Sequence, residues 1–191
     1  MQRIAFDMPG YRRMAVVGVS GSGKTTLARQ LARRLELRHV ELDSLYWDPG
    51  WLPAPAPVFR QRAMQAFECD AWVVDGNHPE VRDIIWGHAD TVVWLDYELD
   101  LVLRRLVVRT VRRCMTGEEL WNGNRERSLR AHLFSRDSIF LWALRTYPLR
   151  RREYRELFGA PKYAHIQPVC LRSPQATRAW LENLPAPAMA L

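Results

Sequence analysis

The sequence predicts an α/β fold, in which a parallel sheet is covered by helices on both faces. The first observation is an alternation of short apolar runs with segments of helical periodicity. The second is a glycine-rich turn that leaves the first apolar run and opens the first helix. The third is that two later apolar runs each end in an aspartate. We expect strands at 14–19, 38–42, 71–75, 91–96 and 164–171, and helices at 26–37, 58–67, 99–113 and 173–184.

Local signals support these elements in turn. The apolar residues of 26–37 fall on one helical face, at positions 27, 28, 31, 32 and 35. Pro168 weakens the last strand, because proline cannot donate to a sheet ladder. Ser173 is the expected N-cap of the last helix, with Pro174 at its first position. Residues 114–155 are mostly helical, with a loop near "WNGN".

Length and composition indicate one folded domain. The chain has 191 residues, of which 48% are hydrophobic and 26% charged. We expect a single domain over 1–184 and a disordered tail at 185–191, in a monomer or a homodimer. No apolar run reaches the roughly 20 residues of a membrane span, and no signal peptide is evident, so the expected location is cytoplasmic. The three scattered cysteines, Cys69, Cys114 and Cys170, have the spacing of neither a disulfide framework nor a zinc site.

The segment "GVSGSGKT", Gly18 to Thr25, matches the phosphate-binding pattern G-x-x-x-x-G-K-[ST] in full. It lies after a strand and opens a helix, so its backbone N–H groups and the helix N-terminus can surround phosphate oxygens. Lys24 is expected to reach the β and γ phosphates of ATP, and the Thr25 hydroxyl to bind Mg²⁺. The predicted nucleotide site comprises Gly18, Ser20, Gly21, Ser22, Gly23, Lys24, Thr25 and Thr26.

A phosphate-binding loop of this kind needs an acidic residue near its metal, usually at the end of a neighbouring strand. Asp75 ends "AWVVD" and Asp96 ends "TVVWLD". One of the two must instead be a cap or turn residue. We favour Asp75 as the second metal-associated residue beside Thr25, because Gly76 permits close approach of backbone or ligand directly after it.

With these motifs in hand, the chain resembles the P-loop small-molecule kinases, the adenylate and shikimate kinase group. It is most similar to the adenylate kinase-related proteins labelled DNA topology modulation proteins. The matching pieces are the P-loop, "LDSLYWDPGW", "WVVDGN", "TVVWLD" and "LRSPQATRAWL", which span nearly the whole of 13–184. The resemblance implies a three-layer P-loop NTPase fold with a five-stranded parallel sheet in the order 2-3-1-4-5, and ATP with Mg²⁺ at the P-loop.

The resemblance also implies roles for two arginines. Nucleotide kinases carry the helix pattern R-hydrophobic-x-x-R before a mobile lid, and "RLVVR" matches it. Arg105 would then lie by the nucleotide base and Arg109 would contact phosphates. After Asp-Gly those kinases continue with Phe-Pro-Arg, whereas this chain reads "NHPEVRD", so only Arg82 offers a substitute for the arginine that binds an acceptor phosphate.

The end of the second strand faces the acceptor side of the cleft in such a fold. Glu41 and Asp43 are two residues apart, on one strand face, and resemble the acidic pair of shikimate-type kinases. Asp43 would orient or deprotonate a hydroxyl acceptor, whereas it would repel a phosphate. The alternative is that Asp43 caps the next helical turn. Tyr46, Trp47 and Trp51 fit a pocket wall and a small core equally well.

The net charge of +7 is concentrated in 104–155, where 14 arginines face 5 acidic residues. This segment can be a lid that closes over the triphosphate, a solvated basic surface, or a nucleic-acid surface. We favour a lid over about 110–150, because Arg125 and Arg127 lie together on one side of the "WNGN" loop and one of them would neutralise the transferring phosphoryl group. Nucleic acid is a possible but less favoured partner.

The sequence thus predicts ATP- and Mg²⁺-dependent phosphoryl transfer to a small-molecule acceptor, nucleoside-, nucleotide- or sugar-like, through a hydroxyl. Lys24, Asp43, Arg109 and Arg125 are the expected catalytic residues. The alternative is an ATP-binding regulator of DNA topology or gene expression with little kinase activity, for which the basic segment is the only support.

Overall fold

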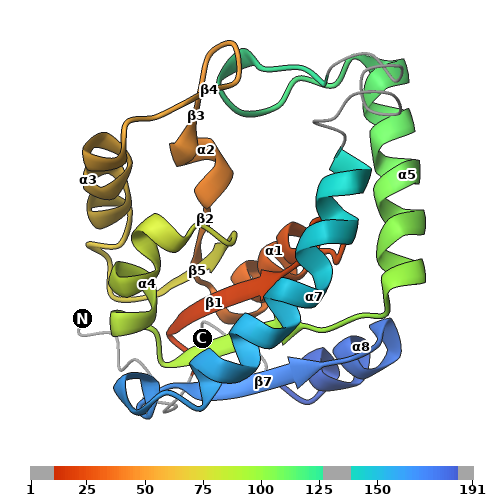
Figure 1. The fold of residues 1–191 in the computed structure, drawn as a ribbon. Coiled ribbons are helices and arrows are strands. Elements are labelled where there is room, and N and C mark those ends of the chain that lie inside the picture. Colours follow the sequence, from red (N-terminus) through yellow and green to blue (C-terminus); the bar gives the residue numbers. More distant parts are fainter. Residues whose placement is uncertain (1–10, 127–138, 185–191) are drawn as a thin grey trace, which may run out of the picture.

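The computed structural model describes residues 11–126 and 139–184. Five strands form one parallel sheet in the order β2-β5-β1-β6-β7, which is the predicted order 2-3-1-4-5 of the sheet strands along the chain (Figure 1). The prediction of the fold is confirmed. The strands are β1 (Arg13–Gly18), β2 (Arg38–Glu41), β5 (Trp72–Asp75), β6 (Thr91–Leu95) and β7 (Gln167–Leu171).

The sheet is buried on both faces because alternate residues of each central strand enter different cores. In β1, Ala15 and Val17 join one apolar cluster, while Met14 and Val16 join the other. The first cluster contains residues of α3, α4 and α7, and the second contains residues of α1, α5 and α8. Burial on both faces explains why these strands read as continuous apolar runs.

The helices surround the sheet as the alternation predicted. The longer ones are α1 (Lys24–Leu35), α3 (Ala56–Ala66), α5 (Leu99–Thr116), α7 (Ile139–Phe158) and α8 (Pro174–Glu182). Ser173 caps α8 as expected, accepting a hydrogen bond from the Ala176 N–H at 3.1 Å. Pro168 is accommodated because β7 lies at the sheet edge.

Several elements around β2 and β5 differ from the prediction or were missed. The expected strand 38–42 ends at Glu41, and its last residue opens the five-residue helix α2 (Leu42–Tyr46). A small hairpin follows, β3 (Trp47–Asp48) with β4 (Leu52–Pro53). Helix α4 (Arg82–His88) has too few residues for a clear periodic signal.

Short 3-10 turns complete the described part of the chain, at Pro79–Val81 (η1), Trp121–Gly123 (η2) and Pro161–Tyr163 (η3). The segment with η2 leaves the far end of α5 and reaches the β3–β4 hairpin at the top of Figure 1. Among the described residues, no helix combines the length and apolar character needed to cross a membrane.

Candidate active site

The phosphate-binding loop has the backbone that its glycines predict. Gly21 adopts a φ of 88°, and a Cβ atom there would lie 2.8 Å from the Val102 carbonyl oxygen on α5. Gly18 adopts a φ of 148°, and its Cβ would lie 2.8 Å from the Ser22 hydroxyl. Gly23 precedes α1, whose N-terminus has no side-chain cap. The loop can therefore pass close under α5 while the first N–H groups of α1 remain free for an anion.

Thr25 and Asp75 lie together, as the predicted metal site requires. The Thr25 hydroxyl donates to Asp75 Oδ2 at 2.5 Å, and Asp75 is buried at the end of β5. His39 Nε2 lies 2.8 Å from Asp75 Oδ1. No sequence motif marks His39, which lies on the neighbouring strand β2.

Asp96, the other candidate acid, is held elsewhere. Its carboxylate lies 2.5 Å from Nε and 2.9 Å from Nη2 of Arg151 on α7. The geometry therefore places Asp75 beside Thr25 and gives Asp96 a structural partner. The metal-associated role of Asp75 stays a prediction, for which its place beside Thr25 is suited.

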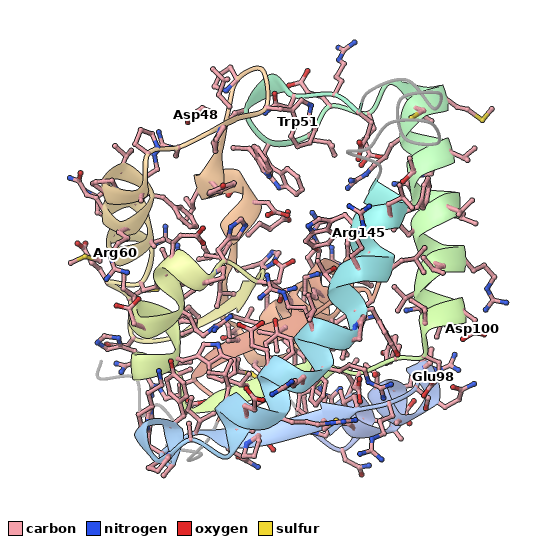
Figure 2. All side chains as sticks on the ribbon, in the orientation of Figure 1. Asp48, Trp51, Arg60, Glu98, Asp100 and Arg145 are labelled. Atoms are coloured by element: carbon pink, nitrogen blue, oxygen red, sulfur yellow. The ribbon has the colours of Figure 1, made fainter. Side chains whose placement is uncertain are left out.

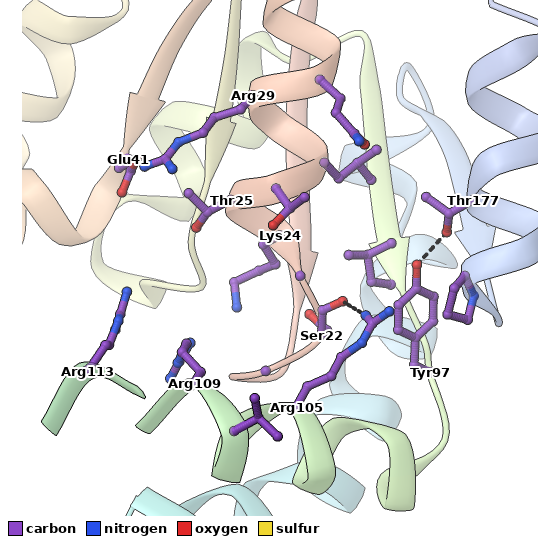
Figure 3. A pocket seen from close by; sticks show the side chains of 18 of the residues that line it. Ser22, Lys24, Thr25, Arg29, Glu41, Tyr97, Arg105, Arg109, Arg113 and Thr177 are labelled. Atoms are coloured by element: carbon purple, nitrogen blue, oxygen red, sulfur yellow. Dashed lines mark hydrogen bonds and ion pairs between the residues drawn. The ribbon is translucent and has the colours of Figure 1, made fainter. Parts of the chain in front are cut away.

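Lys24 lies at the centre of the charged groups (Figure 3). Its ammonium donates to the Val19 carbonyl oxygen at 3.1 Å. Burial lowers the pKa of Lys24 from 10.5 to about 8, against the opposing pull of Asp43 and Asp75, with Arg109 lowering it further. An anionic ligand would favour the charged form of this lysine.

Helix α5 brings Arg105 and Arg109 to the loop, and Figure 3 shows both on the side that faces α1. Arg105 donates to the Ser22 carbonyl oxygen at 3.1 Å and lies over the Tyr97 ring at 5.3 Å. Arg109 donates to the Ser20 hydroxyl at 3.2 Å. Burial lowers the pKa of Arg109, and neighbouring Arg113 adds to this effect. Both arginines thus contact the phosphate-binding loop, and the expected places of Arg105 by the nucleotide base and of Arg109 at the phosphates stay predictions.

Asp43 does not share a strand face with Glu41, so this expectation was wrong. The strand ends at Glu41, and Asp43 lies in the first turn of α2. Glu41 accepts hydrogen bonds from Arg29 at 2.6 Å and from the Trp121 indole at 2.9 Å. Asp43 turns the other way and pairs through Oδ1 with His78 Nε2 at 2.8 Å.

Asp43 is also not the N-cap of the helical turn that follows the strand, which was the alternative prediction. Glu41 occupies the N-cap position of α2 and makes no side-chain cap hydrogen bond. The negative charge of Asp43 instead favours the charged forms of Lys24 and Arg109, raising the pKa of each against the effect of burial. The carboxylate therefore belongs to the charged site around the phosphate-binding loop.

Tyr46, Trp47 and Trp51 form a chain of edge-to-face contacts, 4.8 Å between the first two rings and 5.5 Å between the last two. Tyr46 packs on the core residue Phe59 at 5.1 Å, whereas Trp51 meets Trp121 at 6.2 Å. The aromatic residues thus extend from the core to the segment after α5. The prediction of a small core fits Tyr46, and that of a pocket wall stays open for Trp51.

The comparisons with known proteins agree with this geometry. No protein-family model matches the chain. A shikimate kinase of Synechococcus elongatus is 30% identical over 139 residues, which are 62% of this chain and 73% of that protein.

The chain belongs to the shikimate kinase family.

Solved structures show the same fold. A shikimate kinase from Acinetobacter baumannii, solved in complex with shikimate, aligns with a TM-score of 0.56 and 17% identity, covering 91% of this chain and 90% of that one. A shikimate kinase from Bacteroides thetaiotaomicron aligns with a TM-score of 0.53 and 15% identity, covering 90% and 94%. As a member of the shikimate kinase family, this P-loop protein is a phosphotransferase, an ATP-dependent kinase of a small molecule.

The residues present fit a nucleotide with its metal. Within the described part of the chain, Ser22 Oγ is buried without a hydrogen-bond partner, and a Cβ atom at Gly18 or Gly21 would lie within 3 Å of neighbouring atoms. Thr25 and Asp75 supply the hydroxyl and carboxylate oxygens that Mg²⁺ prefers. The loop opens on a cavity of about 1210 Å³, whose lining includes Lys24, Thr26 and Arg105.

The structure does not bring Arg125 to this cavity, contrary to its expected catalytic role. Its guanidinium is exposed and lies 3.8 Å from Glu119, while its backbone oxygen accepts from the Trp51 indole at 2.8 Å. Arg127 and residues 185–191 lie outside the described residues. The predicted lid over 110–150 begins within α5 and ends within α7, and it stays a prediction.

Arg150 is the arginine that the sequence analysis missed. Three consecutive arginines of α7 have different surroundings. Arg150 is half-buried, pairs with Glu153 at 2.7 Å and lowers the pKa of Lys24. Arg151 holds Asp96, and Arg152 pairs with Glu156 at the surface. A run of arginines reads as a solvated helix, and only Arg152 fits that interpretation.

Proposed function

We propose that this kinase transfers the γ-phosphoryl group of ATP to a hydroxyl of a small, anionic acceptor. The observation that carries the proposal is Asp43, a carboxylate close enough to Lys24 and Arg109 to act on their charges. A carboxylate in that place helps a hydroxyl and repels a phosphate acceptor.

The roles follow from position and charge. Lys24 and the N–H groups of the loop hold the triphosphate, and Thr25 and Asp75 would hold Mg²⁺, which supplies charge neutralisation at the β and γ phosphates when bound. The acceptor hydroxyl gives its proton to Asp43 while its oxygen bonds to the γ phosphorus. The bond from that phosphorus to the bridging oxygen breaks and ADP leaves. Arg109 and Arg150 stabilise the charge on the phosphoryl group in transfer.

Positive charge beyond Asp43 supports an anionic acceptor. Arg82 and Arg150 share a single acid, Glu153, at 2.6 and 2.7 Å, so this group carries a net positive charge. Arg82 begins α4, directly after the turn that bears His78. The Acinetobacter baumannii shikimate kinase was solved in complex with shikimate, which is a carboxylic acid that carries hydroxyl groups. We propose that the acceptor of this chain belongs to the same class of hydroxy acids.

A panel of acceptors tests the proposal. ATP consumption is measured with shikimate and other hydroxy acids, uncharged sugars, nucleosides and nucleoside monophosphates. We expect turnover with a hydroxy acid, loss of turnover in Lys24→Ala without loss of the fold, and a large fall in kcat in Asp43→Asn. Preference for a monophosphate, or a full rate in Asp43→Asn, would contradict the assignment.

The specific likeness to DNA topology modulation proteins, and a regulatory role on DNA, stay a prediction with less support. Several described arginines of the basic segment are paired with acids, among them Arg112 with Glu118 and Arg113 with Glu126. Pairing reduces the charge free for a phosphate backbone. Submicromolar DNA binding with a steep salt dependence near physiological salt would favour the regulator, and no binding there would exclude it.

A further inference from the structure

His78 lies directly behind the Asp43 carboxylate. Its Nε2 is 2.8 Å from Asp43 Oδ1, and its side chain is 17% exposed. The ring lies 4.4 Å from the Tyr46 ring and 5.2 Å from the Phe59 ring, measured between centroids. Contacts on two sides leave the imidazole little freedom to rotate, so it is a rigid partner for the carboxylate.

The turn that carries His78 is itself fixed. Gly76 packs so tightly on α2 that a Cβ atom would lie 2.7 Å from the Leu42 Cβ. Asn77 accepts from the Gly18 N–H at 3.2 Å and from the Tyr154 hydroxyl at 2.8 Å, and it donates to the Gly18 carbonyl oxygen. The turn after β5 is thus tied to the phosphate-binding loop and to α7 together.

The hydrogen bond decides how Asp43 can act. An ionised carboxylate only accepts, so the Nε2 of His78 carries the proton and donates to Oδ1. The Asp43 side chain is 42% exposed, and its carboxylate has no second hydrogen bond among residues 11–126 and 139–184. Oδ2 is then the oxygen available to an acceptor hydroxyl.

We propose that His78 is a positioning residue for phosphoryl transfer, holding Asp43 so that one carboxylate oxygen meets the acceptor hydroxyl. This inference rests on the proposed function, since it needs Asp43 to contact the acceptor. Positioning matters because an ångström of misplacement at a reacting group costs about 100-fold in rate.

Two substitutions separate positioning from packing. His78→Phe keeps an aromatic ring between Tyr46 and Phe59 but removes the donor. His78→Gln keeps an N–H donor at similar reach and loses the ring. We expect His78→Phe to lower kcat by about 10- to 100-fold with little change in ATP affinity, and His78→Gln to recover most of it. His88→Gln, at an exposed histidine on α4, is the matched control.

A double-mutant cycle tests whether His78 acts through Asp43. In an Asp43→Asn background, His78→Phe should cost less than about threefold, because the positioned group is already gone. A full kcat in His78→Phe, an equal loss in His78→Gln, or an additive loss in the double mutant would each overturn the inference while leaving the kinase assignment intact.

A readout without turnover keeps the two proposals distinguishable. Imidazole ¹⁵N spectra of the folded protein should show His78 protonated at Nε2, with a changed signal in Asp43→Asn. An unchanged signal would refute the pair itself. If the wild-type enzyme phosphorylated none of the hydroxyl compounds, the proposed function would be refuted, and with it the role of His78.

Discussion

Lys24 shows how a single side chain combines a motif with its surroundings. The motif predicts that it reaches phosphate, but the lowered pKa comes from burial among groups brought by other elements. Asp43 and Asp75 favour its charged form, whereas Arg109 and Arg150 oppose it. Burial thus brings the pKa of Lys24 down to about 8, so we expect ATP binding to depend on its proton.

The pH dependence of ATP affinity follows from this. Below pH 8 the ammonium is charged and meets the triphosphate, and above it the free protein loses that proton before binding. We expect the affinity for a non-hydrolysable ATP analogue to be flat from pH 6.5 to 7.5 and to fall about tenfold by pH 9, measured by titration calorimetry. Lys24→Arg, which stays charged, should lack the fall. A flat wild-type profile to pH 9 would show that the lysine keeps its proton.

Only some of the residues in the candidate site could be predicted from the sequence. Lys24, Thr25 and Asp75 could be found because a contiguous motif or a strand end marks them. His39, His78 and Arg150 could not, because each reaches the site from an element whose approach is set by packing. The prediction that Glu41 and Asp43 share a strand face was wrong because the strand ends at Glu41, one residue earlier than the apolar pattern indicates, and α2 begins at Leu42. Arg125 was misjudged because a loop sequence does not say which side of the loop faces the phosphates.

At the scale of elements, the segment after α5 is fastened to the β3–β4 hairpin mainly by two asparagines. Asn124 is buried, accepts from the Trp51 N–H at 2.7 Å and donates to the Asp48 carbonyl oxygen at 3.0 Å. Asn122 donates to the Trp47 carbonyl oxygen at 2.6 Å. Trp51 adopts a φ of 59°, which these bonds help to hold, and Figure 2 labels it where the hairpin meets this segment. The "WNGN" sequence is thus a docking element between the two sides of the cleft.

Asn124→Ala should release this docking. The substitution removes two bonds to the hairpin and leaves the Trp51 N–H without its partner, at a cost of about 1–3 kcal/mol. We expect faster hydrogen exchange in 117–126 and 47–53, a higher KM for the acceptor and an unchanged affinity for ATP. Glu119→Ala, at an exposed side chain of the same segment, is the control. Unaltered exchange in Asn124→Ala would mean that the docking depends on the tryptophan contacts instead.

At the scale of the whole molecule, a charged pair joins the end of a central strand to helix α7, which covers the sheet. Asp96 follows β6, and Arg151 comes from α7, far along the chain. Alternating patterns predicted the layers, because layering depends on burial along each element, whereas the strand order was implied by the resemblance to P-loop kinases. They could not predict this pair, because which residue of α7 meets the end of β6 depends on the angle between helix and sheet.

Substitution of the adjacent residues Arg151 and Arg152 provides a matched test of the Asp96–Arg151 ion pair. Arg151→Met leaves the buried Asp96 carboxylate unpaired, so the free energy of unfolding should fall by roughly 3 kcal/mol in urea denaturation. Arg152→Met, one residue away at the surface, should cause no measurable change. ATP affinity should persist in both. Equal stability of the two variants would show that the pair contributes nothing to the union of sheet and helix.

The three arginines of α7 make the length of this helix as important as its composition. Successive residues of an α-helix are rotated by about 100°, so one inserted or deleted residue turns every later side chain by that amount. An insertion between Tyr147 and Arg150 would turn Arg150 toward Asp96, move Arg151 to the surface position of Arg152, and give the place of Arg150 near Lys24 to the residue before it. Arg152 can therefore be replaced without disturbing the site, whereas an added residue between Tyr147 and Arg150 would displace Arg150 from the charged groups around Lys24.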